Sequence, residues 1–133
     1  MATKVKALIT TDHYKTVLTN SRRELIADEP IELGGTDLGF SPGELLCSAL
    51  ASCTSVTVRM YADRKGWALA GVLVDVEFER DNATNTTLFK RHITLMGNLE
   101  EAQKAQLLNI ANKCPIHKIL TNPITIASDL VKE

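Results

Sequence analysis

The sequence predicts an α+β domain in which antiparallel strands surround one long central helix. Three observations lead to this fold class. The first part of the chain alternates apolar and polar residues, an apolar helical run of 24 residues follows from Glu44 to Trp67, and a second pair of alternating stretches comes after it. A length of 133 residues is that of one domain, so residues 1–133 are expected to form a single unit.

The N-terminal third predicts three strands. Residues 4–10, 14–19 and 22–28 each alternate with a period near two, and short polar turns separate them. This order predicts an antiparallel meander. Residues 29–44 are rich in glycine and proline, which predicts a tightly shaped loop.

The central helix has a clear start signal. Ser41 suits the N-cap, Pro42 the first helical position, and Glu44 the third position, where it completes a capping box. Gly66 ends the helix. One apolar stripe is expected along it, formed by Leu46, Ala49, Leu50, Cys53, Val56, Thr57 and Met60.

The next two elements read as a strand pair. Residues 69–81 and 86–97 alternate, and a polar turn joins them. The side chains predicted to share the inner face of the first strand are Val72, Val74, Val76 and Phe78.

The last part predicts two helices and a strand. Residues 98–113 form an amphipathic helix, residues 114–122 a short helix with Cys114 at its cap, and residues 123–131 a final strand. The inner side of the longer helix is expected to carry Leu99, Ala102, Ala105, Leu108 and Ala111 or Asn112.

Composition argues against several classes of function. The net charge is -1 and no basic run is present, which argues against a nucleic-acid partner. We find no stretch apolar enough for a membrane span and no secretory segment, so a cytoplasmic location is expected. Neither a metal nor a cofactor is expected, because no ligand spacing or phosphate-binding glycine loop is present.

The three cysteines are the main candidates for chemistry. None lies in a CxxC pair, which argues against a disulfide framework and against structural zinc. Cys53 lies in the apolar stripe, which favours a buried core residue and leaves a reactive thiol as the alternative. Cys114 precedes Pro115 at a helix start, where the helix dipole favours a thiolate, and His117 is in reach of that turn. Cys47 is about 120° around the helix from Cys53 and is interpreted as a packing residue.

Taken together, these motifs resemble the OsmC/Ohr family (osmotically inducible protein C and organic hydroperoxide resistance protein), in its OsmC-like branch. The resemblance rests on residues 41–67, on "NKCPIHK" at 112–118, on "ADEP" at 27–30 and on "GGTDLGFSP" at 34–42. It implies an intertwined homodimer whose sheets wrap around the central helices. It also implies a thiol-dependent peroxidase that reduces organic hydroperoxides and is itself reduced by a small dithiol or a dihydrolipoyl-type reductant.

The resemblance also implies roles for particular residues. Cys53 matches the peroxidatic cysteine and Cys114 the resolving cysteine. The family uses an arginine to hold the peroxidatic thiolate. Arg23 is favoured here because it alternates onto the side of Leu25, with Arg22 as its neighbour of opposite face.

Some of this correspondence is incomplete. Arg91 is the alternative to Arg23. The glutamate that orients the arginine in Ohr proteins falls at Gly43, so Glu44 is interpreted first as a capping residue. His117 stays a supporting candidate beside Cys114. Two other functions remain open: a redox-reactive stress or sensor protein with little turnover, and a dimer that binds a small ligand and has structural cysteines.

Overall fold

A computed structural model describes residues 2–133 of the chain. The chain forms two compact units, Met1–Ser48 and Ala49–Glu133. Helix α1 (Pro42–Lys65) begins in the first unit and continues through the second. The single domain expected from the length stays a prediction.

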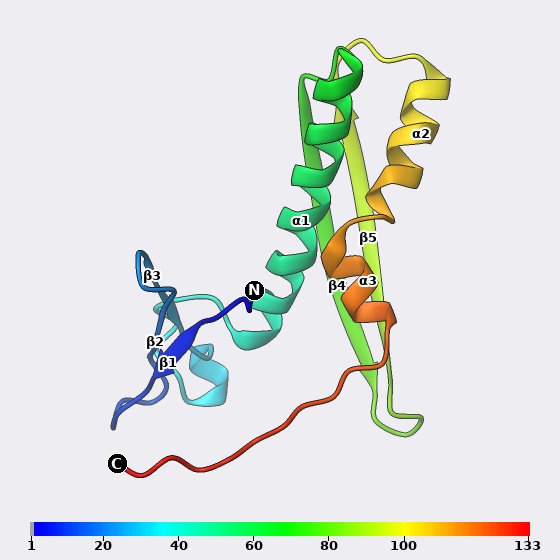
Figure 1. Ribbon diagram of the computed structural model, residues 1–133. Helices are drawn as coiled ribbons and strands as arrows, with labels where there is room; N and C mark the ends of the chain where they lie inside the picture. Colours follow the sequence, from blue (N-terminus) through cyan, green and yellow to red (C-terminus); the bar gives the residue numbers. More distant parts are fainter. Residues whose placement is uncertain (1) are drawn as a thin grey trace. The chain divides into compact units, whose positions relative to one another are not determined.

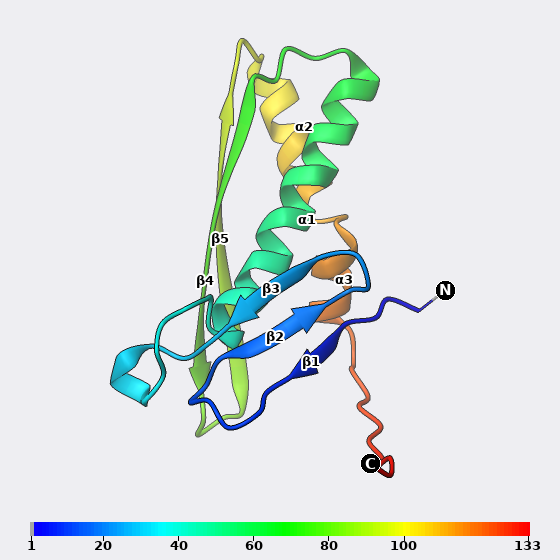
Figure 2. The ribbon, with the colours of Figure 1, turned by 90° about the vertical axis from the view of Figure 1, so that its left-hand side faces the viewer.

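The first unit contains the predicted meander. Strands β1 (Lys6–Leu8), β2 (Thr16–Thr19) and β3 (Glu24–Ala27) pair antiparallel in the order β1-β2-β3, as Figure 2 shows. They are shorter than the alternating stretches. A short 3-10 helix, η1 (Ile31–Leu33), follows.

Asp28 organises the glycine-rich loop after β3. Its side chain is only 2% exposed, and it accepts a hydrogen bond from the Thr36 hydroxyl at 2.6 Å. The backbone N–H groups of Tyr14, Glu29 and Leu38 also donate to it. The Thr36 hydroxyl and these N–H groups hold the pKa of Asp28 far below its usual range, although burial opposes the shift. In the "ADEP" motif, Asp28 therefore holds the loop in its conformation through these hydrogen bonds.

The second unit is a long hairpin with helices on one of its faces (Figures 1 and 2). Strands β4 (Gly71–Asp81) and β5 (Thr86–Met96) pair antiparallel along their full length. Helix α1 and helices α2 (Glu101–Ala111) and α3 (Pro115–Thr121) lie on the same side of the hairpin. The predicted inner face is confirmed, since its four side chains are half-buried while Asp75, Glu77 and Glu79 are exposed.

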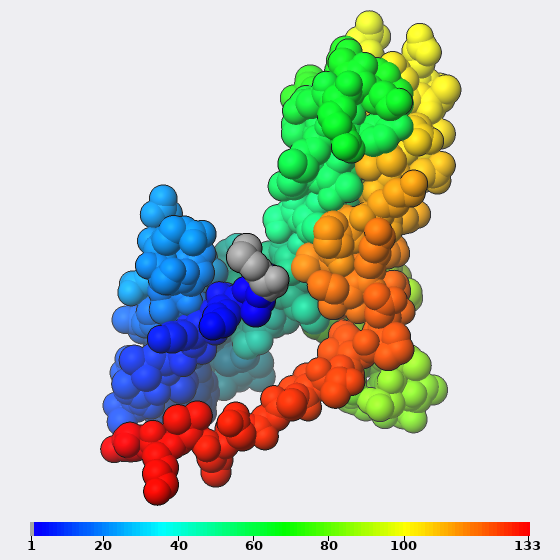
Figure 3. Space-filling model, viewed as in Figure 1, coloured from blue at the N-terminus to red at the C-terminus, as the bar shows by residue number. Residues whose placement is uncertain are grey.

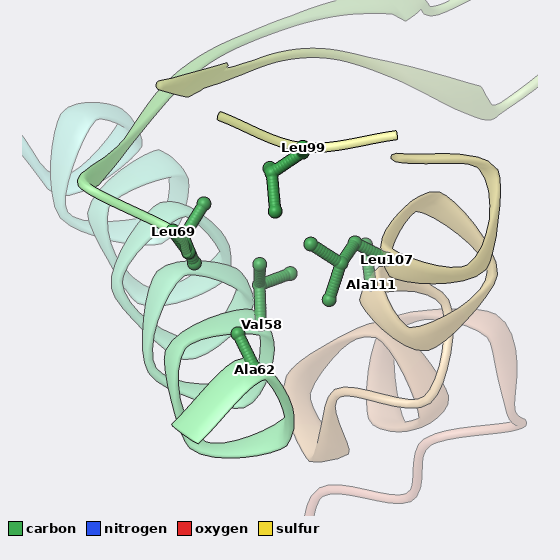
Figure 4. Close-up of a cluster of buried hydrophobic side chains, with 6 residues drawn as sticks. All are labelled: Val58, Ala62, Leu69, Leu99, Leu107 and Ala111. Carbon is green, nitrogen blue, oxygen red and sulfur yellow. The ribbon is translucent and has the colours of Figure 1, made fainter. Parts of the chain in front are cut away.

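The core of this unit lies between α1 and α2. Figure 4 shows α1 and α2 facing each other through their apolar side chains, closed by residues of the connecting segments. The buried cluster consists of Val58, Ala62, Leu69, Leu99, Leu107 and Ala111. Tyr61 and Trp67 pack edge to face beside it, with ring centroids 5.6 Å apart.

Two predicted helix faces need correction. The buried residues of α1 repeat at four-residue steps, and they are Leu50, Thr54, Val58 and Ala62. Val56 and Met60, which were expected to be packed, are 54% and 61% exposed. In α2 the buried leucine is Leu107, whereas Leu108 is 57% exposed. Both α1 and α2 have apolar residues on more than one face, and this chain buries only one face of each. The sequence pattern alone therefore did not indicate which face is packed.

The predicted final strand is wrong for this chain. Residues 123–131 pair with no strand among the residues described and leave the body of the second unit as one extended segment (Figure 3). Ile126 is 84% exposed and Leu130 is 101% exposed. Alternation shows that a segment suits a sheet, but a strand also needs an edge with which to pair.

Helix α1 also corrects the expectation that no segment has the composition of a membrane span. It is 24 residues long, and its most apolar 18-residue window has a mean hydropathy of 1.2. Val58 and Ala62 of the same helix are fully buried against α2. The apolar character of α1 is therefore partly that of a core helix.

Candidate functional site

Cys53 lies on α1 at the floor of an open apolar groove. The thiol is half-buried, and the groove has a volume of about 460 Å³. Side chains of α1 and the first turn of α3 line it together with Cys53, namely Ala49, Ser52, Val56, Thr57, Met60, Pro115 and Ile116. The groove brings a thiol and apolar surface together.

Cys114 caps the N-terminus of α3, as the sequence predicted, with Pro115 at the first turn. Its side chain is fully buried, at 0% exposure. The backbone N–H of His117 donates to its Sγ at 3.3 Å. The hydroxyl of Thr54, the residue after Cys53 on α1, lies 4.0 Å from the same Sγ.

Cys53 and Cys114 lie near each other, although a hairpin and a helix separate them in the chain. Pro115 and Ile116, which follow Cys114, line the groove together with Cys53. Burial raises the pKa of Cys53, and interaction with Cys114 raises it further, against the opposing effect of the backbone N–H of Ile116 and the hydroxyl of Thr57.

Cys114 shifts in the other direction. Burial alone would raise its pKa, but the N–H of His117, the thiol of Cys53 and the hydroxyl of Thr54 all stabilise the thiolate and lower the pKa overall. Of the two cysteines, Cys53 is therefore the more exposed, and Cys114 has the more stabilised thiolate.

His117 lines a cavity other than the groove at Cys53. Its half-buried ring lines this second cavity, of about 240 Å³, with Leu50, Phe89, Arg91 and Leu120 among its walls. Burial and the nearby charge of Arg91 lower the pKa of His117, so the ring is neutral at pH 7. Its direct link to the cysteine is the backbone N–H.

Arg91, on β5, is a cation that lies near the two cysteines within the second unit. Its Nη1 donates to the Thr54 hydroxyl at 3.0 Å and to the carbonyl of Ala111 at 3.3 Å, and its Nη2 donates to the Asn112 side chain at 2.7 Å. The sequence pointed to Arg91 only as the alternative to Arg23. Its alternation with Ile93 and Leu95 on β5 was the signal that it faces inward.

Thr54 was missed by the sequence analysis. It is a fully buried polar residue beside Cys53, and it donates to the carbonyl of Leu50 at 2.7 Å. The four-residue step from Leu50 through Thr54 to Val58 was the available signal, because it places a hydroxyl on the packed side of α1.

The remaining candidates lie in the first unit. Arg22 and Arg23 are exposed, and Arg23 lines a hollow of about 200 Å³ with Leu18 and Leu25. The role of Arg23 at Cys53 stays a prediction.

Glu44 and Ser41 form the predicted capping box. The N–H of Ser41 donates to Glu44 Oε1 at 2.9 Å, and the N–H of Glu44 donates to Ser41 Oγ at 3.2 Å. Cys47, farther along the helix, is half-buried. Among residues 2–133 no cluster of three or more His, Cys, Asp or Glu side chains is arranged to hold a metal ion.

The fold has known counterparts. A protein of Psychrobacter arcticus 273-4 assigned to the osmotic stress and detoxification response is 26% identical, with a TM-score of 0.75 over 90% of this chain and 88% of that one. An OsmC-like protein of Mycoplasma pneumoniae is 18% identical, with a TM-score of 0.77 over 90% and 87%. The organic hydroperoxide resistance protein OhrB of Bacillus subtilis is 17% identical, with a TM-score of 0.63 over 91% of each chain.

No curated protein sequence matches the chain. The family model described as OsmC-like protein matches residues 35–129, which include α1, the β4–β5 hairpin, α2, α3 and both Cys53 and Cys114. With its α+β architecture, long central helix and antiparallel sheets, the chain belongs to the OsmC-like protein family.

Proposed function

We propose that this protein is a cysteine-based, thiol-dependent peroxidase that reduces organic hydroperoxides, with Cys53 as the peroxidatic and Cys114 as the resolving cysteine. The observation that carries the proposal is the proximity of these two cysteines: Cys53 lines an open groove, and the buried Cys114 caps α3, whose first residues Pro115 and Ile116 line the same groove. Membership of the OsmC-like family, whose structural neighbours include organic hydroperoxide resistance proteins, supports it.

The reaction begins at the exposed sulfur. The Cys53 thiolate attacks the outer oxygen of the hydroperoxide, the O–O bond breaks, and the alkoxide leaves with a proton as an alcohol. The product is a sulfenic acid on Cys53. Cys114 attacks that sulfur as a thiolate, hydroxide leaves and is protonated to water, and a Cys53–Cys114 disulfide forms. A small dithiol then reduces the disulfide by exchange.

The groove indicates the substrate class. Ala49, Val56, Met60, Pro115 and Ile116 present apolar surface beside Cys53. An alkyl or acyl chain buries apolar area there, whereas hydrogen peroxide has none to bury. The preferred substrate is therefore an organic hydroperoxide.

The proposal includes a homodimer in the cytoplasm, with neither membrane nor nucleic acid as a partner. Val56 and Met60, which line one side of the groove, form an apolar strip on α1 that this chain leaves exposed, and exposed patches of this kind mark protein interfaces. The proposed interface therefore borders the substrate groove. A second copy of the chain is the expected cover, as in the family that the chain resembles.

A turnover assay tests the proposed function. Cumene, tert-butyl and fatty-acid hydroperoxides and hydrogen peroxide are compared as substrates, with dithiothreitol or dihydrolipoamide as reductant. Turnover is expected for wild type and for Cys47→Ser, with organic substrates preferred. Cys53→Ser should be inactive. Full activity of Cys53→Ser would overturn the assignment.

One observation favours a second candidate, a redox-reactive stress or sensor protein with little turnover. The pKa of Cys53 is raised, so its thiol is not activated within the second unit. A single oxidation of Cys53 without catalytic cycles would favour the sensor. Resistance of Cys53 to both peroxide and alkylation would favour the third reading, a dimer that binds a small ligand.

A further inference from the structure

We propose that Arg91 and Thr54 are positioning residues that keep Cys114 ready as the thiolate nucleophile of the disulfide-forming step. The inference rests on the proposed function, in which Cys114 is the resolving cysteine. Arg91 was first considered as the alternative to Arg23 at the Cys53 sulfur, whereas here it acts on the sulfur of Cys114.

The contacts form a chain from β5 to the buried sulfur. Arg91 Nη1 donates to Thr54 Oγ1 at 3.0 Å, and Thr54 Oγ1 lies 4.0 Å from Cys114 Sγ. The guanidinium is also held at the end of α2, through the carbonyl of Ala111 and the side chain of Asn112. Three partners on two elements leave Arg91 little freedom to turn away.

The direction of these hydrogen bonds favours a thiolate over a thiol. A hydroxyl has one hydrogen and two lone pairs, and Arg91 occupies one lone pair of Thr54. The hydroxyl is thereby disposed to donate: it donates to the Leu50 carbonyl at 2.7 Å, and its one hydrogen can turn to the Cys114 sulfur, 4.0 Å away, when that sulfur is charged. A donor beside a sulfur stabilises its charged form.

The charge of Arg91 is not cancelled by a carboxylate. The side-chain ion pairs in the described part of the chain are Arg59–Asp63 and Lys104–Glu101, and the partners of Arg91 are neutral oxygens. The other titratable groups at Cys114 are the thiol of Cys53 and the neutral ring of His117, while Lys113 and Lys118 are exposed. A half-buried cation two hydrogen bonds from a buried sulfur favours its thiolate.

The consequence falls on the second chemical step. When Cys53 carries a sulfenic acid, Cys114 attacks that sulfur, an S–S bond forms, and the S–O bond breaks with loss of hydroxide. A raised pKa of Cys114 lowers the thiolate fraction about tenfold per unit at a pH below the pKa. A more basic thiolate is also a better nucleophile, which offsets part of that loss. Disulfide formation is therefore slowed about threefold for each unit by which the pKa of Cys114 rises.

The test separates this role from simple packing. Variants Thr54→Val, Thr54→Ser, Arg91→Met and Arg91→Lys are made in a Cys47→Ser background, with Arg80→Met as the control. Arg80 is on the same hairpin and donates to the exposed side chains of Thr87 and Asn85. Thiolate absorbance near 240 nm is titrated in a Cys53→Ser form of each variant, and circular dichroism checks the fold.

Thr54→Val and Arg91→Met are expected to raise the pKa of Cys114, the latter by about one unit. Thr54→Ser should keep the wild-type value because it keeps the hydroxyl, and Arg80→Met should also keep it. Rapid-quench mapping should then show disulfide formation slowed more than the oxidation of Cys53. An unchanged pKa in a folded Thr54→Val protein would overturn the inference, even if Arg91→Met does not fold.

The readouts also distinguish the two proposals. The titration needs no substrate, so it is decisive even in a protein without turnover. A raised pKa of Cys114 in a protein that does not reduce hydroperoxides would overturn the proposed function and leave the role of Arg91 and Thr54 at this sulfur established. Turnover of hydroperoxides together with an unchanged pKa of Cys114 in the variants would support the proposed function and overturn the role of Arg91 and Thr54.

Discussion

Cys53 and Cys114 shift each other's pKa in opposite directions: interaction with the buried Cys114 raises the pKa of Cys53, whereas interaction with Cys53 lowers the pKa of Cys114, so the buried sulfur has the more stabilised thiolate. This division follows from position. Cys114 caps a helix and receives the N–H of His117, whereas Cys53 lies in the middle of α1, where the N–H groups of its own helix are already bonded.

We expect peroxide to produce an intrachain Cys53–Cys114 disulfide. One equivalent of cumene hydroperoxide is added to the protein, and the oxidised sample is mapped by non-reducing peptide mass spectrometry. The bond should form in high yield, because Cys53 lies beside the first turn of α3 that Cys114 caps, and a disulfide needs Cα atoms about 4.4–6.8 Å apart. A Cys47–Cys53 link as the main product would contradict this pairing.

Arg23, rather than Glu44, is expected to control the thiolate of Cys53. Arg23→Met and Glu44→Ala are each combined with Cys47→Ser and Cys114→Ser, and the rate of Cys53 alkylation is followed against pH. Arg23→Met should raise the apparent pKa, with one unit worth about 1.4 kcal/mol. Glu44→Ala should cost about 1 kcal/mol of folding stability through loss of the capping box. A shift with Glu44→Ala alone would reverse these roles.

The Asp28 carboxylate should make folding stability depend on pH in the acid range. Its pKa is lowered in the folded chain, so its contribution is complete above its ordinary value of 3.8 and is lost as the pH falls below that value. Asp28→Asn should lower the urea midpoint at pH 7 and flatten its decline between about pH 5 and pH 3. Asp75→Asn, an exposed carboxyl on β4, is the control and should retain the wild-type profile.

Two adjacent leucines on α2 should differ sharply in their effect on stability. Leu107 is fully buried in the core, whereas Leu108 is 57% exposed. Leu107→Ala should cost about 2–5 kcal/mol of unfolding free energy, because it leaves a cavity. Leu108→Ala should stay within about 0.5 kcal/mol. Urea denaturation of both variants provides the measurement, and similar losses would place the packed face of α2 elsewhere.

The exposed strip of α1 should be a dimer contact. Met60 is 61% exposed, and a glutamate there would bury a charge in any interface that uses this face. Wild type is expected to be a dimer in multi-angle light scattering at micromolar concentration, and Met60→Glu a monomer. Leu108→Glu, the same kind of change on α2, should remain dimeric. A stable, folded wild-type monomer would exclude the dimer.

Much of the secondary structure was predictable because its signals are local. Ser41, Pro42 and Glu44 marked the start of α1, and the hydrogen bonds of the capping box confirm it. Cys114 and Pro115 marked the start of α3 in the same way. Caps, turns and alternation depend on neighbours within a few residues, so the chain carries these signals wherever it folds.

The sequence by itself determined which elements form, where the helices begin and which cysteines deserved attention. Only the tertiary structure decided that Leu50, Thr54, Val58 and Ala62 are the packed face of α1, that residues 123–131 find no strand in this chain, and that Thr54 and Arg91 converge on Cys114. The physical reason is that packing, strand pairing and the pKa of a buried thiol depend on groups brought together from distant parts of the chain. Those groups are neighbours only once α1, β5 and α3 have packed against one another.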